Sequence, residues 1–347
     1  DEIIAGTQDK NNDINVQIYD ESRAWGNLLE VSTGVPNSAY RAFDIAYEGL
    51  SGDALIVYES SNSADSVINY RAWDGEGYSD EMSFSTGLDA GTIAWVKLVR
   101  SQGSDDIMLL VHNQLNGFYA VLWDGDGFDT DKALVLSEGT TSNTEQHFDF
   151  AWESSSGQGI IVYGETDLTY RTYDPVGGFG STENTISTGD IDAVRLCSDS
   201  SSDHIGMIWQ DSGNDVNVRM WDGSQILSGA PSEDTSTEQN GQNNANVDCA
   251  WERGGTEAIF TYADVAGASS NGRDYVTYLT FSKPNSWSAA SLDAGSTSAS
   301  FASDDIEGIR LVEHPTTDEM MLLAMDLAED VSAIRWDGSS FQTVTTS

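Results

Sequence analysis

Short apolar runs separated by polar turns recur along the whole chain. One phrase, FDIAY at 43–47, has close copies that begin at Phe148 and Val247. A second phrase lies between these copies and begins at Val96, Val194 and Ile309. The runs have the length and the β-branched and aromatic content of strands, and no stretch shows sustained helical periodicity. The pattern therefore predicts an all-β chain built from internal repeats.

The two phrases alternate, so the repeat is about 50 residues long and a double repeat about 100. In the second repeat three more strand-like segments follow the phrase, at 54–58, 66–73 and 82–86. The segment before the last strand usually ends in Trp-Asp-Gly, as at Trp73, Trp123, Trp221 and Trp336. Asp-Gly suits a tight hairpin turn, and the preceding Trp is expected to pack between neighbouring sheets. Four antiparallel strands per repeat predict a β-propeller.

Seven blades account for the length of the chain. Their approximate bounds are 1–40, 41–90, 91–147, 148–192, 193–246, 247–305 and 306–347, which together form a single domain over 1–347. The first blade shows three strands, at 3–8, 15–19 and 28–32, and lacks its innermost strand. The alternatives are an incomplete or truncated blade, which we expect, or a place filled by preceding residues or by a strand of another subunit. The rival architecture, three tandem β-sandwiches, has no half-repeat of four strands.

The charge of the chain excludes several classes of partner. Asp and Glu number 57 against 15 Lys and Arg, which gives a formal net charge of −42. Such a surface repels phosphate backbones and anionic membranes, so neither nucleic acid nor membrane insertion is expected. Self-repulsion of this size is relieved by salt, which favours a saline or cation-rich exterior.

Charged residues of opposite sign occupy one position of the first strands. Acids stand in alternate blades and bases in the others, and the six positions are Asp44, Lys97, Asp149, Arg195, Asp248 and Arg310. Because first strands line the channel of a propeller, we expect a ring of alternating charges there. It serves either to fix blade order through ion pairs or to bind a polar ligand.

Acidic turns are the candidate metal sites. Oxygen-rich sequences occur at Asp9, Asn11 and Asp13, at 211–215 and 326–330, and at Asp124, Asp126 and Asp129. Ca²⁺ takes six to eight oxygen ligands, but none of these turns matches an EF-hand loop. The alternatives are a calcium site and plain solvated turns, and no other cofactor is expected.

Signatures of catalysis are sparse. The four histidines have no metal-ligand spacing, and no nucleophile-elbow, P-loop or dinucleotide motif occurs. Glu48, Glu153 and Glu252 recur after the first strands, which favours a structural role over a catalytic one. Cys197 and Cys249 fall in neighbouring repeats, and we expect two buried free thiols rather than a bridge.

The chain resembles the divergent seven-bladed propellers of secreted and cell-surface proteins of archaea and bacteria. The resemblance depends on the blade-length repeat and on the closing hairpin, as in Trp123-Asp124-Gly125-Asp126-Gly127-Phe128. It does not extend to WD40 repeats or sialidases, whose characteristic motifs are absent, so no functional residue is carried over.

The resemblance implies a non-enzymatic extracellular or cell-surface propeller. It would serve as an adhesion or ligand-binding module for protein or carbohydrate, or as a building block of a surface assembly that grows by strand addition. The alternative is a secreted glycan-active hydrolase or lyase, which should show a unique carboxylate pair or Tyr/Glu pair, whereas a scaffold should show equivalent residues in several blades.

Overall fold

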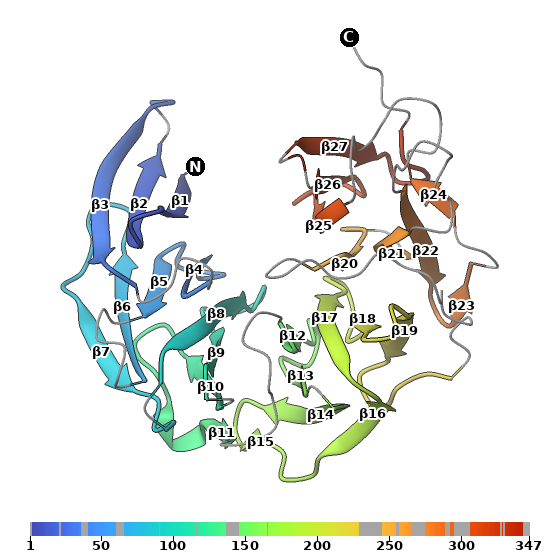
Figure 1. Cartoon of the computed structure of the whole chain (residues 1–347), viewed down its shortest axis with the longest axis horizontal. Helices are drawn as coiled ribbons and strands as arrows, with labels where there is room; N and C mark the ends of the chain where they lie inside the picture. Colours follow the sequence, from blue (N-terminus) through green and yellow to red (C-terminus); the bar gives the residue numbers. More distant parts are fainter. Residues whose placement is uncertain are drawn as a thin grey trace. The chain divides into compact units, whose positions relative to one another are not determined.

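The computed structural model describes most of the chain. The described residues are 2–20, 22–35, 41–59, 66–89, 91–115, 117–136, 146–164, 166–228, 245–254, 257–264, 275–288, 292–294, 306–326, 328 and 330–342. They fall into two compact units, Asp1–Thr144 with Val176–Phe179 and Glu145–Pro175 with Gly180–Ser347. Each unit consists of antiparallel sheets that follow the chain (Figure 1).

Three sheets make up most of the first unit. Their strands are β1 (Ile3–Gln8), β2 (Asp13–Tyr19), β3 (Trp25–Thr33); β4 (Phe43–Tyr47), β5 (Ala54–Glu59), β6 (Val67–Trp73), β7 (Met82–Ser85); and β8 (Ile93–Arg100), β9 (Ile107–Asn113), β10 (Phe118–Trp123), β11 (Leu134–Leu136). The short strand β15 (Gly178–Phe179) and the 3₁₀ turn η1 (Thr130–Lys132) also belong to this unit. Strands pair in chain order, as in a meander.

The second unit contains four further sheets. Their strands are β12 (Phe148–Trp152), β13 (Gly159–Tyr163), β14 (Asp167–Asp174), β16 (Asn184–Thr188); β17 (Ile191–Ser198), β18 (Ile205–Asp211), β19 (Val216–Trp221); β20 (Val247–Trp251), β21 (Glu257–Asp264), β22 (Tyr275–Ser282), β23 (Ser286–Trp287), β24 (Leu292–Ala294); and β25 (Ile306–Glu313), β26 (Met320–Asp326), β27 (Val331–Trp336).

The strands agree with the repeat. In the second repeat the structure has strands at Ala54–Glu59, Val67–Trp73 and Met82–Ser85, each within two residues of its predicted bounds. The first sheet has the three predicted strands, and the all-β class is confirmed among the described residues, whose one helical element is η1. The bounds of the single domain stay a prediction.

The prediction of four strands per repeat is confirmed for the sheets of β4–β7 and β8–β11. In the described part of the chain, β17–β19 and β25–β27 form three-stranded sheets, and residues 229–244 and 343–347, where their fourth strands would be expected, lie outside the described residues. In the repeat that starts at β20, two short pieces, β23 and β24, both pair with β22.

Apolar faces of successive sheets form the core of each unit. Central strands such as β5, β9 and β13 are buried along their whole length, because both faces of the sheet are covered. In the first unit Leu55 and Val57 of β5 join Leu98 and Leu109 of the next sheet in one cluster. First strands lie side by side, β4 with β8 in the first unit and β12, β17, β20 and β25 in succession in the second. Each sheet therefore depends on its neighbours for burial.

The Trp-Asp-Gly turns have the conformation that their sequence predicts. The glycines Gly75, Gly125, Gly223 and Gly338 have φ angles of 85°, 93°, 90° and 90°. Side chains with a β-carbon are strained at such angles, so glycine is the residue that fits. The preceding aspartate closes the turn, as where Asp124 Oδ1 accepts the N–H groups of Asp126 and Gly127.

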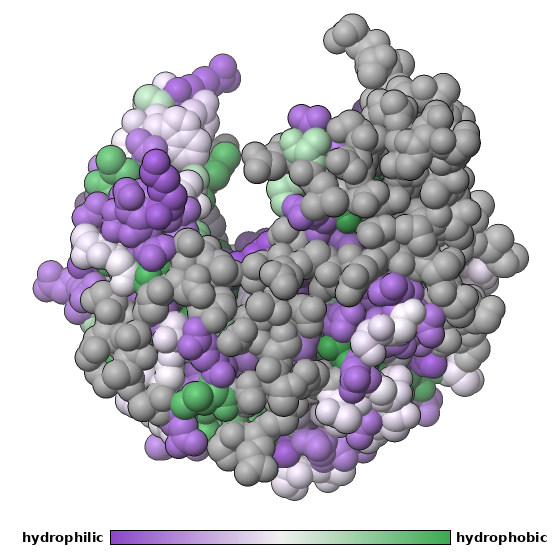
Figure 2. All heavy atoms as spheres, viewed as in Figure 1, coloured by the Kyte–Doolittle hydropathy of each residue, from purple (hydrophilic) through white to green (hydrophobic). Residues whose placement is uncertain are grey.

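The visible surface is largely hydrophilic. Figure 2 shows purple residues over much of the described surface, with hydrophobic green residues in separate small patches. In the described part of the chain no helix is long and apolar enough to cross a membrane.

Candidate functional site

Three aspartates of the predicted ring connect one sheet to the next. Asp44 of β4 accepts the N–H of Ile45 with Oδ1, and its Oδ2 accepts the N–H of Leu98 on β8 at 2.7 Å. The second unit repeats the contact between sheets twice, Asp149 with Leu196 and Asp248 with Leu311, at 2.9 Å each. These carboxylates therefore bind backbone groups of the neighbouring first strand, a structural use that sequence reasoning did not identify.

The basic members of the ring lie on the first strands, as predicted. Arg310 Nη1 lies 3.8 Å from Asp248 Oδ2. Arg195 is buried, and its Nη1 donates to the carbonyl of Val194, while Lys97 is half-buried on β8. The structure thus brings Asp248 and Arg310 together, and a single ring of all six residues stays a prediction.

The recurring tryptophans and glutamates join the same pairs of sheets. Trp123 Nε1 donates to Glu48 Oε1 at 2.7 Å. Equivalent bonds run from Trp221 to Glu153 and from Trp336 to Glu252, at 2.8 and 3.0 Å. The prediction that these tryptophans pack between neighbouring sheets is confirmed. The glutamates repeat for the same structural reason, because a buried indole N–H needs an acceptor.

The acidic hairpins use their carboxylates to close their own turns. Asp9 Oδ1 accepts the N–H groups of Asn11 and Asp13, and Asp211 and Asp326 make the same pattern in later sheets. Asp129 pairs with Lys132 at 2.9 Å. Among the described residues no three His, Cys, Asp or Glu side chains are arranged to hold a metal ion. Calcium binding by Asp9, Asn11 and Asp13 or by Asp124, Asp126 and Asp129 stays a prediction.

The expectation of two free thiols is wrong. Cys197 of β17 and Cys249 of β20 form a disulfide across two sheets, with their Cα atoms 5.7 Å apart. The first strands of these sheets lie side by side, which brings together two residues that are 52 positions apart in the chain. The two cysteines are close together because neighbouring sheets pack side by side, which the local sequence around each cysteine does not reveal.

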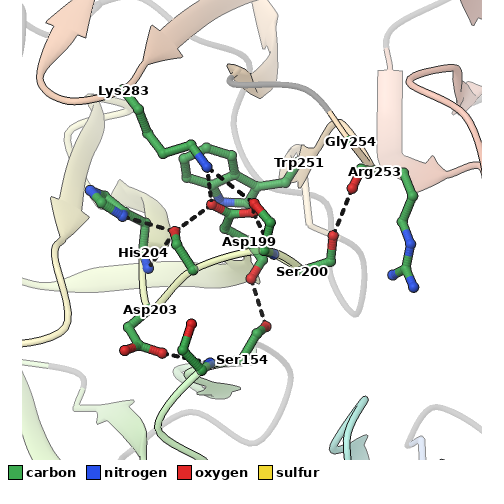
Figure 3. A network of polar contacts seen from close by, with 12 residues as sticks. Ser154, Asp199, Ser200, Asp203, His204, Trp251, Arg253, Gly254 and Lys283 are labelled. Carbon is green, nitrogen blue, oxygen red and sulfur yellow. Dashed lines mark hydrogen bonds and ion pairs between the residues drawn. The ribbon is translucent and has the colours of Figure 1, made fainter.

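A partly buried polar network lies at the hairpin between β17 and β18 (Figure 3). Asp199 accepts hydrogen bonds from Lys283 Nζ at 2.6 Å and Ser202 Oγ at 2.5 Å, and Lys283 also lies over the ring of Trp251. Ser202 Oγ lies 3.0 Å from His204 Nδ1. The network contains Ser, His and Asp, so we tested it as a catalytic triad.

The order of these groups does not suit nucleophilic catalysis. Ser202 donates its proton to Asp199 and therefore accepts from His204, whereas a triad needs the histidine to take the proton of the serine. Burial lowers the pKa of His204, so its ring is neutral at pH 7 and can donate from Nδ1. Burial alone raises the pKa of Asp199, but the hydrogen bonds from Lys283 and Ser202 hold it below its ordinary value. The network joins neighbouring sheets, and its hydrogen-bond order differs from that of a catalytic triad.

A second kind of polar cluster occurs twice and is partly exposed. In the sheet of β4–β7, Tyr58 Oη donates to Glu81 Oε2 at 2.6 Å, and Arg71 Nη2 lies 4.0 Å from the same oxygen. In the second unit, Tyr163 Oη donates to Glu183 Oε2 at 2.5 Å, and Arg171 Nη2 lies 3.3 Å from that oxygen. We call each set a Tyr–Glu–Arg cluster, defined as Tyr58, Glu81 and Arg71 or as Tyr163, Glu183 and Arg171.

The two clusters occupy equivalent places in their sheets. Each arginine pairs with the third residue of the second strand, Arg71 with Ile56 and Arg171 with Ile161. Each arginine also donates from Nη1 to a backbone carbonyl, that of Ser79 at 2.7 Å or Gly180 at 3.3 Å.

Burial of the tyrosines fixes the protonation state of the clusters. Burial raises the pKa of both hydroxyls, that of Tyr163 to about 12, so both stay protonated and donate to the glutamates. The glutamate side chains are 43% and 46% exposed, so solvent reaches both clusters. In each cluster, a solvent-accessible glutamate carboxylate thus lies beside a tyrosine hydroxyl that donates to it.

The clusters were missed in the sequence, although a signal was present. The segments YRAW at 70–73 and YRTY at 170–173 repeat an arginine between aromatic residues about 100 residues apart. The glutamate follows at different distances, at Glu81 and Glu183, because the turn before the last strand differs in length. The two glutamates therefore do not align with each other when the repeats are superposed on their arginines.

Comparisons with known proteins identify the fold. A lectin, BP39L from Burkholderia pseudomallei, superposes with a TM-score of 0.67 at 10% identity, over 98% of this chain and 93% of that one. The β-propeller domain of the Trilobed protease from Pyrococcus furiosus superposes with a TM-score of 0.50 at 10% identity, over 99% and 94%. No family model and no curated protein matches the sequence. The chain therefore has the β-propeller fold, as the repeat predicts.

Proposed function

We propose that the protein is a non-enzymatic, carbohydrate-binding β-propeller module. The observation that carries the proposal is the presence of the same Tyr–Glu–Arg cluster at equivalent places in two sheets. A catalytic Tyr/Glu pair would be unique, whereas equivalent sites in several blades are typical of a binding scaffold. Carboxylate and guanidinium groups at a partly exposed position form hydrogen bonds with sugar hydroxyls.

The fold supports the same function. One structure with this fold, BP39L, is a lectin. At 10% identity the likeness bears on the fold alone, so the sugar-binding role of this chain depends on its own clusters.

The setting we propose is extracellular or on the cell surface, where the module contributes to adhesion. The net charge of −42 and the disulfide between Cys197 and Cys249 support an oxidising and saline environment. The seven antiparallel sheets of the described residues support seven blades. Protein partners and self-assembly at the three-stranded first sheet belong to the same proposal, and the molar mass in solution tests assembly.

A glycan array tests the proposed function. The fluorescently labelled chain should bind a subset of immobilised glycans, and the free glycan should compete for that binding. The same glycans incubated with the protein should remain intact by mass spectrometry. If the chain binds none of the glycans on the array, the proposal is overturned. Cleavage of a bound glycan would support the hydrolase or lyase alternative instead.

A further inference from the structure

We propose that each Tyr–Glu–Arg cluster binds two neighbouring hydroxyl groups of an uncharged sugar ring, so that one chain holds two sugars. This inference deepens the proposed function and rests on it. It concerns the chemical class of the ligand and the number of sites, neither of which follows from the fold.

The first argument is the fixed geometry of the clusters. In the second unit one oxygen of Glu183 is held by Tyr163 at 2.5 Å and by Arg171 at 3.3 Å. Arg171 also donates to the hydroxyl of Tyr163 and to the carbonyl of Gly180. Both charged side chains are therefore oriented before a ligand arrives, which reduces the entropy lost on binding.

The second argument is the pairing of donor and acceptor. A carboxylate only accepts hydrogen bonds, a guanidinium only donates them, and a hydroxyl does both. Two hydroxyls on adjacent ring carbons, with oxygens about 3 Å apart, can therefore give one hydrogen bond to the glutamate and take one from the arginine. Two hydroxyls give each charged group its own partner, whereas a single hydroxyl must share one oxygen between the glutamate and the arginine.

The third argument is charge. Each arginine is already paired with a glutamate, so Arg71 with Glu81, or Arg171 with Glu183, offers no net positive charge to a ligand. The whole chain carries −42, which repels anions at a distance. Sugars that bear carboxylate or sulfate groups are therefore excluded, and uncharged sugars remain.

A third sheet, that of β20–β24, has the same backbone arrangement as the two clusters but does not have their charged side chains. The backbone frame is the same there, since Ser288 N–H donates to the carbonyl of Thr280 as Ser79 N–H does to that of Ala72. Tyr262 stands in the tyrosine position, but Leu279 replaces the arginine, and no acid occurs among residues 289–291. This sheet therefore lacks both charged groups of the cluster.

A further arginine, in the sheet of β17–β19, has a tryptophan in place of the tyrosine of the clusters. Arg219 lies two residues before Trp221, as Arg71 lies before Trp73, but its guanidinium lies 5.5 Å from the ring centre of Trp209. Among the described residues, two places thus combine tyrosine, glutamate and arginine.

Isothermal titration with methyl glycosides tests the inference. The probe is the uncharged methyl glycoside of the terminal sugar of the strongest array hit, with its monodeoxy analogues and the corresponding uronic acid. We expect a stoichiometry of two, an affinity at least tenfold lower for the analogue that lacks one of the two recognised hydroxyls, and no binding of the uronic acid.

Leucine variants identify the sites, because Leu279 shows that this sheet position accepts leucine. Arg71→Leu and Arg171→Leu should each reduce the stoichiometry from two to one, and the double variant should not bind. Arg335→Leu is the matched control, since Arg335 forms an exposed ion pair with Glu319 without a tyrosine and should keep both sites. Circular dichroism melts check that all variants fold.

The outcomes separate this inference from the proposed function. Binding of a glycan that persists in the folded double variant, a stoichiometry other than two, or equal affinity for the uronic acid would overturn the inference and leave carbohydrate binding standing. If Arg71→Leu or Arg171→Leu unfolds, Glu81→Gln and Glu183→Gln replace them with the same expectation. No binding of any glycan by the natural chain would overturn both.

Discussion

At the scale of single residues, Glu59 is an acid placed in an apolar setting. It ends β5, is 3% exposed, and has one oxygen that accepts the N–H of Ile93 at 2.7 Å. Among the described residues, the other oxygen has no hydrogen-bond partner. The equivalent positions of the two sister sheets hold Gly164 and Ala263, so no acid is required there by the fold. Burial raises the pKa of Glu59 to about 8.

The pH dependence of unfolding should reveal this group. Because the folded pKa lies above the ordinary value of 4.5, the contribution of Glu59 is fully present below pH 4.5 and is lost as pH rises through 8. The change amounts to a few kcal/mol, since one pKa unit corresponds to about 1.4 kcal/mol. Urea melts from pH 5 to 9 should show this decline, and Glu59→Gln should flatten it. Glu319→Gln, a control at an exposed position, should leave the decline unchanged. If the natural chain and both variants lose stability equally with rising pH, the raised pKa is not that of Glu59.

The buried indole bonds allow a second test at this scale. Trp221→Phe removes the indole N–H that donates to Glu153 Oε1 but keeps most of the apolar volume of the side chain. Burial already raises the pKa of Glu153, so loss of this partner should lower the free energy of unfolding by about 1–3 kcal/mol. Trp25→Phe is the control, because Trp25 is 51% exposed. Equal denaturation midpoints for the two variants would show that the bond to Glu153 contributes nothing.

At the scale of elements, the disulfide is the covalent link between β17 and β20. It closes a loop of 52 residues, for which the chain-entropy model gives a stabilisation of about 4 kcal/mol. Reduction should therefore lower the thermal midpoint markedly, and Cys197→Ser with Cys249→Ser should reproduce that shift and make the protein insensitive to reductant. A reductant effect of equal size in the double serine variant would contradict this account.

Prediction from sequence succeeded where one element determines its own structure. The first phrase gave β4, β12 and β20, and the Asp-Gly pairs gave turns with positive φ, because apolar alternation and glycine act within a few residues. It failed where two elements meet. The bond from Asp44 to Leu98, the disulfide and the offset of Glu81 and Glu183 depend on which strands lie side by side and on turn length.

At the scale of the whole molecule, charge is the dominant feature. With 57 acidic and 15 basic residues, most acids have no basic partner to neutralise them. Some carboxylates accept backbone N–H groups, as Asp149 and Asp203 do. Exposed acids remain in large excess over bases and repel one another across each unit.

Salt should therefore stabilise the folded chain. Between 0.1 and 1 M NaCl the screening length falls from about 10 to 3 Å, which removes repulsion among exposed carboxylates while leaving the buried bonds of Asp149 and Glu153 almost untouched. We expect the thermal midpoint to rise steadily over this range at pH 7, and to rise less at pH 4, near the sequence pI of about 4.1. Sucrose at matched osmolality is the control, because it strengthens apolar burial without screening charge. A midpoint that is flat in NaCl, or that rises equally in sucrose, would show that repulsion does not limit the stability of this protein.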